Sequence, residues 1–127
     1  MTIKRNERGQ TMVEFAVVLP VLALLLFGVI QFGIAFNNYL TITDAVRAGA
    51  RKAAVSADAV DPAGAATTEV QSSAGSLDLS QLNVSVTSTW KQGDDVTVQA
   101  TYPYSIHLLG LYDFSGQLKS KATERVE

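Results

Sequence analysis

The sequence predicts an α+β protein built from a long amino-terminal helix, a short second helix and a small antiparallel sheet of about three strands. Three observations support this prediction. An apolar run without any charged side chain extends from residue 15 to residue 43. Helical periodicity continues beyond that run. The last third of the 127-residue chain alternates between apolar and polar side chains, as strands do.

The apolar run is long enough to cross a lipid bilayer. A helix over residues 15–36 measures about 33 Å at 1.5 Å per residue, against a hydrocarbon core of about 30 Å. Pro20 lies inside this helix and predicts either a kink or a locally melted stretch, between which the sequence does not decide. The flanking Lys4, Arg5 and Arg8 favour an amino terminus in the cytoplasm and a carboxyl-terminal domain outside it.

A cleaved secretory signal is an alternative interpretation of the run. The small residues Gly33 and Ala35 are spaced to allow a cut that leaves Phe36 as the first residue. However, the run is longer than the roughly 7–15 apolar residues of a typical signal, and the helical pattern continues through the cut. A retained membrane helix is therefore the favoured interpretation.

The long helix is expected to continue past the membrane as an amphipathic segment, from about residue 12 to residue 56 in all. Apolar or small residues recur at helical spacing on one face. They are Tyr39, Ile42, Val46, Gly49 and Ala53. Asp44, Arg47 and Arg51 fall off this face. The small side chains near the end of the helix permit close approach by another element.

A short second helix is expected after a break at residues 58–61. Asp61 can cap its amino end, and Pro62 fits the first turn, where a missing N–H does no harm. Gly75 is a stop signal. The expected inner face consists of Ala63, Ala66, Val70, Ser73 and Leu77. We therefore divide the chain into a leader (1–9), a spine helix (10–57) and an extracytoplasmic α+β domain (58–127).

Three segments of this domain show the period-two pattern of antiparallel strands with one wet face. They cover residues 82–90, 96–102 and 118–126. A turn at residues 92–95 joins the first two. We expect the sheet to pack on the amphipathic half of the long helix, with Trp90, Tyr102 and Tyr104 in the core. Residues 107–114 form a loop rich in large apolar side chains, which favours packing at the base of the domain over a partner site.

The composition argues against enzymes, metal sites and nucleic-acid binding. The net charge is −2, and without residues 1–9, which hold three basic residues and one acidic residue, it is −4, so the chain does not attract phosphates. There is no cysteine, and the one histidine, His107, has no accompanying nucleophile motif. Asp94 and Asp95 follow Gly93 in a turn rather than a calcium loop. We expect no catalytic residue, cofactor, metal or small-molecule substrate.

Glu14 is the one charged residue between Arg8 and Asp44, and it stands at the start of the apolar run. A carboxylate in this position is costly in hydrocarbon unless it is paired. One interpretation is an acid that reaches to the membrane surface without a partner. The other is a carboxylate that pairs with an amine on a neighbouring helix.

Three stretches of the amino-terminal half form a recognisable signature. They are RGQTMVEFAVVLP at residues 8–20, FGIAF at residues 32–36 and AVRAGAR at residues 45–51. Together they resemble the TadE-like proteins, which are minor pilin-like proteins (pseudopilins) of the tight-adherence, or Flp, pilus, a branch of the type IV pilus systems. The resemblance covers roughly residues 8–55.

The resemblance implies a bacterial precursor that is held in the inner (cytoplasmic) membrane and processed there. A prepilin peptidase would cut between Gly9 and Gln10. Glu14 would then be the fifth mature residue, where it takes part in inter-subunit pairing. In assembled pili of this kind, a proline at the position of Pro20 accompanies local helix melting.

The implied function is structural: a minor subunit in the assembly or initiation of the pilus, with other pilins and pilus assembly proteins as its partners. The chain departs from the type IV pilin pattern at Gln10, where Phe or Met is usual. Phe15 stands after Glu14 where the major Flp pilins have Tyr, which favours a minor component.

A different class of protein remains as the alternative, a membrane-anchored or secreted extracytoplasmic binding domain unrelated to pili. The first residue of the mature chain separates the interpretations. It is Gln10 for a processed pilin, Phe36 for a secreted domain, and Met1 or Thr2 for a plain anchor.

Overall fold

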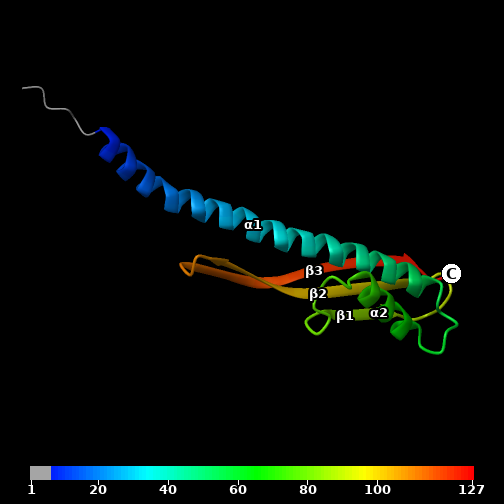
Figure 1. Ribbon diagram of the computed structural model, residues 1–127. Coiled ribbons are helices and arrows are strands. Elements are labelled where there is room, and N and C mark those ends of the chain that lie inside the picture. The colour runs from blue at the N-terminus through cyan, green and yellow to red at the C-terminus, as the bar shows by residue number, and fades with distance from the viewer. Residues whose placement is uncertain (1–6) are drawn as a thin grey trace, which may run out of the picture.

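The computed structural model describes residues 7–127, which form one long helix with a small α+β domain along its carboxyl-terminal half (Figure 1). The elements are the helices α1 (Glu7–Ala54) and α2 (Pro62–Ser73) and the strands β1 (Asn83–Ser88), β2 (Asp95–Leu108) and β3 (Tyr112–Arg125). The predicted α+β fold, with a long amino-terminal helix, a short second helix and a three-stranded antiparallel sheet, is confirmed. Most of the predicted leader, residues 1–6, lies outside the described residues.

Helix α1 is continuous from Glu7 to Ala54, so it begins earlier than the expected residue 12 and ends two residues before the expected residue 56. Its carboxyl-terminal part packs on α2, β2 and β3. The buried residues there are Ile42, Ala45, Val46, Gly49, Ala50, Ala53 and Ala54. The predicted inner face is therefore correct except at Tyr39, which remains exposed because it lies beyond the edge of the core.

Helix α2 begins as expected. The Asp61 side chain accepts a hydrogen bond from the backbone N–H of Gly64 (2.9 Å), and Pro62 is the first helical residue. Ala66 and Val70 are buried. Ser73, predicted to face inward, is exposed, and the buried position is taken by Ala74, directly after the helix.

The two helices approach each other closely at Gly49. A Cβ atom built there would collide with the Val70 side chain and would lie 3.2 Å from the carbonyl oxygen of Ala66. Only a residue without a side chain allows this spacing. The small residues that make the end of α1 thin therefore serve packing inside the chain.

The sheet has the order β1-β2-β3, and both pairs are antiparallel. The central strand β2 supplies the buried side chains, which are Val96, Val98, Ala100 and Tyr102. Trp90 and Tyr104, expected in the core, are only partly buried. Trp90 lies two residues after β1 ends, with a positive φ of 57°, so its ring packs against the edge of the core.

The prediction of a loop over residues 107–114 is wrong, because β2 and β3 extend through most of this segment. The register pairs His107 with Asp113 and Leu108 with Tyr112, which leaves a turn of three residues. The β1 pairing stops at Thr101, and Pro103 follows where no β1 neighbour needs a backbone N–H. Beyond Pro103 the sheet is a two-stranded hairpin that runs back along α1 (Figure 1).

Candidate membrane and assembly surface

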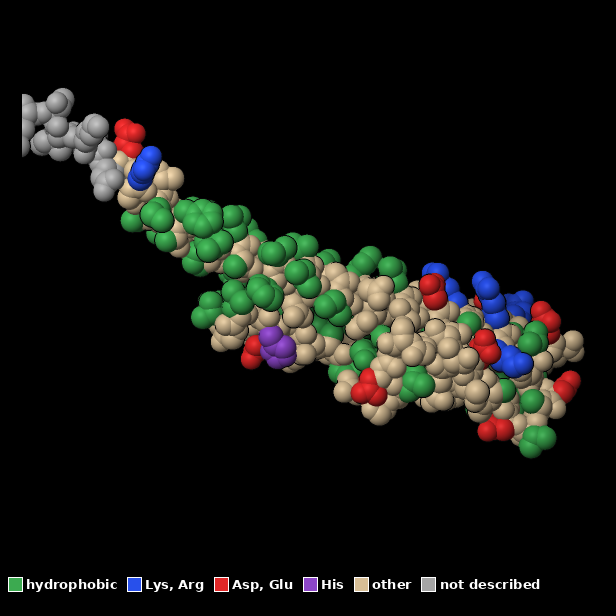
Figure 2. Space-filling view, in the orientation of Figure 1, with side chains coloured by type: hydrophobic (Ala, Val, Ile, Leu, Met, Phe, Trp, Pro, Cys, Tyr) green, Lys and Arg blue, Asp and Glu red, His purple; other side chains and the backbone are tan. Residues whose placement is uncertain are grey.

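The amino-terminal half of α1 contacts almost nothing of the folded domain. Its most apolar 18-residue window contains no buried residue. Large side chains such as Met12, Phe15 and Val29 are between 61% and 75% exposed. In Figure 2, hydrophobic side chains cover this half, whereas acidic and basic side chains gather mainly over the folded domain. In residues 7–127, this is the one helix long and apolar enough to cross a membrane.

This exposure distinguishes α1 from the core helix of a soluble domain. A core helix would bury its apolar window, and a monomer in water rarely leaves so large an apolar surface uncovered. The amino-terminal half must therefore be covered by something outside the chain. Its length and composition are those of a membrane anchor.

Glu14 lies on the exposed surface in the second turn of α1. Its Oε1 accepts a hydrogen bond from the side-chain amide of Gln10, one turn earlier, at 3.1 Å. This bond holds the carboxylate against its own helix. No basic side chain of the described residues makes an ion pair with Glu14 within 4 Å.

Gly9 and Gln10, the expected cleavage position, belong to the first turn of α1. Gly9 is half-buried and Gln10 is exposed. Pro20 lies within the helix, which is unbroken on both sides of it. The choice between a kink and local melting at Pro20 remains a prediction.

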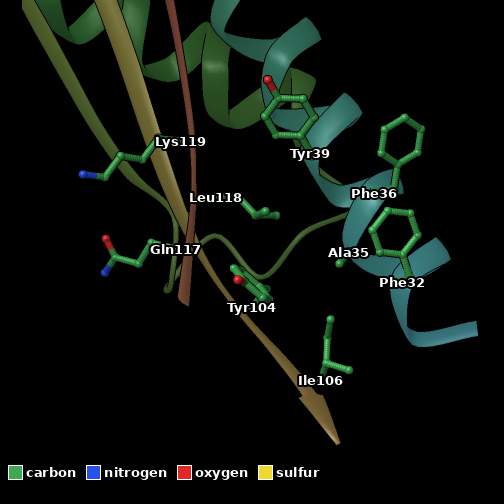
Figure 3. A pocket seen from close by; sticks show the side chains of 9 residues that line it. All are labelled: Phe32, Ala35, Phe36, Tyr39, Tyr104, Ile106, Gln117, Leu118 and Lys119. Atoms are coloured by element: carbon green, nitrogen blue, oxygen red, sulfur yellow. The ribbon is translucent and has the colours of Figure 1, made fainter. Parts of the chain in front are cut away.

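The hairpin of β2 and β3 lies beside the middle of α1 and leaves a shallow apolar groove between them (Figure 3). The groove is lined by Phe32, Ala35, Phe36, Tyr39, Tyr104, Ile106, Gln117, Leu118 and Lys119. In Figure 3, Leu118 points towards α1, whereas Gln117 and Lys119 point away from it. The hairpin thus presents its apolar face to α1.

The hairpin tip, residues 108–114, reaches further along α1 than the sequence suggested. A Cβ atom at Gly28 would lie 3.7 Å from Cδ2 of Leu108, inside the predicted membrane segment. Leu111 and Tyr112 are 70% and 65% exposed. Most side chains of this segment are therefore not in the core, and the expected packing at the base of the domain is limited to Leu108 against α1. The available signal was the charge pattern, because Asp113 is the one Asp, Glu, Lys or Arg between Asp95 and Lys119.

His107 and Asp113 face each other across the hairpin, with Nδ1 and Oδ1 2.7 Å apart. Both side chains are well exposed. No group of three His, Cys, Asp or Glu side chains within the described part of the chain is arranged to hold a metal ion. The pair therefore links the two strands of the hairpin.

The comparison with known families agrees with the geometry of α1. The model of the family described as TadE-like protein matches residues 9–51, which cover most of α1. No curated protein and no solved structure matches the chain. The match includes Gly9, Glu14 and Pro20 and ends within the part of α1 that packs on the domain. Over these residues the chain is similar to the TadE-like family, whose members are structural, pilin-like proteins associated with tight-adherence pili.

Proposed function

We propose that this protein is a minor pilin-like subunit that takes part in the assembly or initiation of a tight-adherence pilus. In this proposal, a prepilin peptidase cuts between Gly9 and Gln10, and the mature chain remains in the inner membrane until it joins other pilins. The amino terminus faces the cytoplasm and residues 58–127 lie outside it. The observation that supports the proposal most strongly is the apolar half of α1, whose most apolar window contains no buried residue.

That exposure fits a subunit with two successive environments. Lipid covers the apolar half before assembly, and helices of other subunits cover it afterwards. The two coverings are equally apolar, so the transfer between them requires little free energy. The folded domain packs mainly on the other half of α1, and only the hairpin tip reaches the apolar half, near Gly28.

Glu14 gives the transfer its specificity. In the unassembled chain, the Gln10 amide hydrogen-bonds to the carboxylate. Cleavage after Gly9 would create an α-amino group on every mature subunit. A staggered neighbouring helix would bring one subunit's amine to another's Glu14, and an ammonium–carboxylate ion pair would replace the bond from the uncharged Gln10 amide.

The test uses four variants, each changed at one acidic residue and each co-expressed with the cognate peptidase and pilins. Glu14→Ala should insert and be cleaved normally but fail to crosslink to the other pilins. The neighbour's ammonium would be left without a partner in apolar surroundings, at a cost of several kcal/mol. Glu14→Gln should fail in the same way, whereas Glu14→Asp should retain part of the association.

Glu7→Ala is the matched control, because Glu7 lies in the same helix but would leave with the leader. It should assemble as the wild type does. Normal association and piliation of a fully cleaved Glu14→Ala protein would show that the carboxylate has no pairing role. Loss of cleavage in Glu14→Ala would show that the peptidase recognises Glu14, and the pairing of Glu14 with an amine would then be unsupported.

A further inference from the structure

We propose that the hairpin tip, residues 108–114, inserts into the lipid leaflet nearest the folded domain and acts as a second membrane contact. The proposal rests on the membrane span of the proposed function. Three observations support it: the position of the tip along α1, the charge pattern of the hairpin and the backbone conformation of the turn.

The position of the tip follows from counting along α1. Roughly 20 residues from Phe15 place the outer boundary of the hydrocarbon core near Ile34. Leu108 contacts α1 at Gly28, six residues and about 9 Å inside that boundary. Apolar segments that lie in the membrane interface reach a depth of about 5–10 Å. A chain embedded through α1 therefore brings its hairpin tip into the leaflet.

The charge pattern suits this position. The tip carries Leu109, Leu111, Tyr112 and Phe114 as exposed apolar or aromatic side chains. Its one acid, Asp113, is paired with His107 across the strands. The nearest Lys or Arg is Lys119, which points away from α1 further back on β3 (Figure 3). Tyrosine and tryptophan side chains are enriched at membrane–water interfaces.

The turn itself uses an unfavourable residue. Leu109 and Gly110 both have positive φ, 51° and 74°, and the N–H of Leu111 donates to the carbonyl of Leu108. Tight hairpin turns of this kind favour Asn or Gly where φ is positive, and a leucine there is strained. The hairpin thus keeps an apolar side chain at its tip even though the backbone there is strained. Lipid contact explains why.

A protein partner is the competing occupant of the tip. Lipid is favoured because the exposed apolar surface is continuous with that of α1, as Figure 2 shows beside the purple histidine. A surface shared with the membrane helix meets the same surroundings as that helix. The turn of the hairpin extends this exposed apolar surface beyond α1.

The full-length chain allows a direct depth measurement, because it contains no cysteine. Single cysteines carrying an environment-sensitive fluorophore are placed at Leu111 (tip), Ser105 (hairpin base), Val21 (membrane helix) and Thr68 (exposed on α2). Each protein is reconstituted in vesicles of phosphatidylcholine and phosphatidylglycerol that contain nitroxide-labelled lipids, with the nitroxide either shallow or deep. Aqueous iodide reports the accessibility from water.

The label at Leu111 should lose most of its emission to the shallow nitroxide and little to iodide. The label at Val21 should respond to the deep nitroxide, and the label at Thr68 to iodide alone. Ser105 lies three residues before Leu108, about 10 Å along the strand, so its label should respond mainly to iodide.

Three results would overturn the insertion. A tip label that iodide quenches, while Val21 reports the deep nitroxide, would remove the tip contact and leave the membrane span intact. A tip label shielded from both quenchers would mean that protein covers it. A Val21 label open to iodide would refute the membrane span and the tip contact together.

Discussion

The two halves of α1 belong to one unbroken helix and have opposite relations to the rest of the chain. The amino-terminal half exposes large side chains, whereas the segment from Ile42 to Ala54 buries mostly small ones, together with Ile42 and Val46. Large apolar side chains suit lipid or loosely fitted neighbours, and small ones permit the close helix contact seen at Gly49. Apolar composition alone therefore does not locate a core. The share of small side chains among the apolar ones indicates which part of α1 is packed by this chain.

The sharpest test of this comparison uses isoleucine in both halves. Ile42 is fully buried and Ile30 is 48% exposed. In detergent, Ile42→Ala should lower the free energy of unfolding of the domain by about 2–5 kcal/mol. Ile30→Ala should change it by less than about 0.5 kcal/mol, because it contacts no core. Denaturant titration followed by the fluorescence of Trp90, the one tryptophan, measures both. Equal effects would contradict the division of α1.

Glycine provides a second matched pair. Gly49→Ala gains about 1 kcal/mol of helix propensity but forces a collision with Val70, so we expect a net loss of about 1–2 kcal/mol. Gly33 has nothing within 4 Å of an added Cβ. Gly33→Ala should therefore leave the domain as stable as the wild type or slightly more so. The same denaturant titration measures the free energy of unfolding of both variants. A stabilised Gly49→Ala protein would show that α1 and α2 are less tightly packed than described.

The smallest expected effect concerns the turn at the hairpin tip. Leu109→Asn relieves a positive φ that leucine tolerates poorly, so the free energy of unfolding should rise by about 1 kcal/mol. The same substitution removes an apolar side chain from the tip, so a fluorophore at Leu111 should become more accessible to iodide in vesicles. A variant that is neither more stable nor more accessible would show that Leu109 is neither strained nor in contact with lipid.

Much of this architecture was predictable because each half of α1 has its own simple pattern. The charge-free run predicted the membrane segment, and the spacing of Ile42, Val46, Gly49 and Ala53 predicted the packed face. The Asp61 cap and the position of Pro62 predicted the start of α2, and both are confirmed.

The hairpin was not predictable in the same way. Consecutive apolar residues at Leu108 and Leu109 interrupt the period-two pattern, and Gly116 is a weak strand residue. The strand persists there because the Tyr104 ring covers Gly116 from the paired position, where an added Cβ would be 2.9 Å from the ring. That compensation depends on a cross-strand pairing which a linear pattern does not show.

The pairing of Glu14 lies beyond the sequence and the isolated chain for a different reason. Its proposed partner is an amine that belongs to another subunit and is created only by cleavage. Within one chain, the geometry shows the Gln10 bond and an exposed apolar surface around it. The sequence contributes the isolation of that acid, since no other charge lies between Arg8 and Asp44.

The most direct test of the account is the mass of the mature protein. The chain is expressed with its cognate prepilin peptidase, extracted from membranes and measured intact, with Gly9→Val as the control that blocks cleavage. The account predicts a wild-type chain that begins at Gln10 and a Gly9→Val chain that keeps its leader. A wild-type chain that begins at Met1 or Thr2 would indicate a plain membrane anchor, and one that begins at Phe36 would indicate a secreted domain. Either result would contradict the proposed subunit.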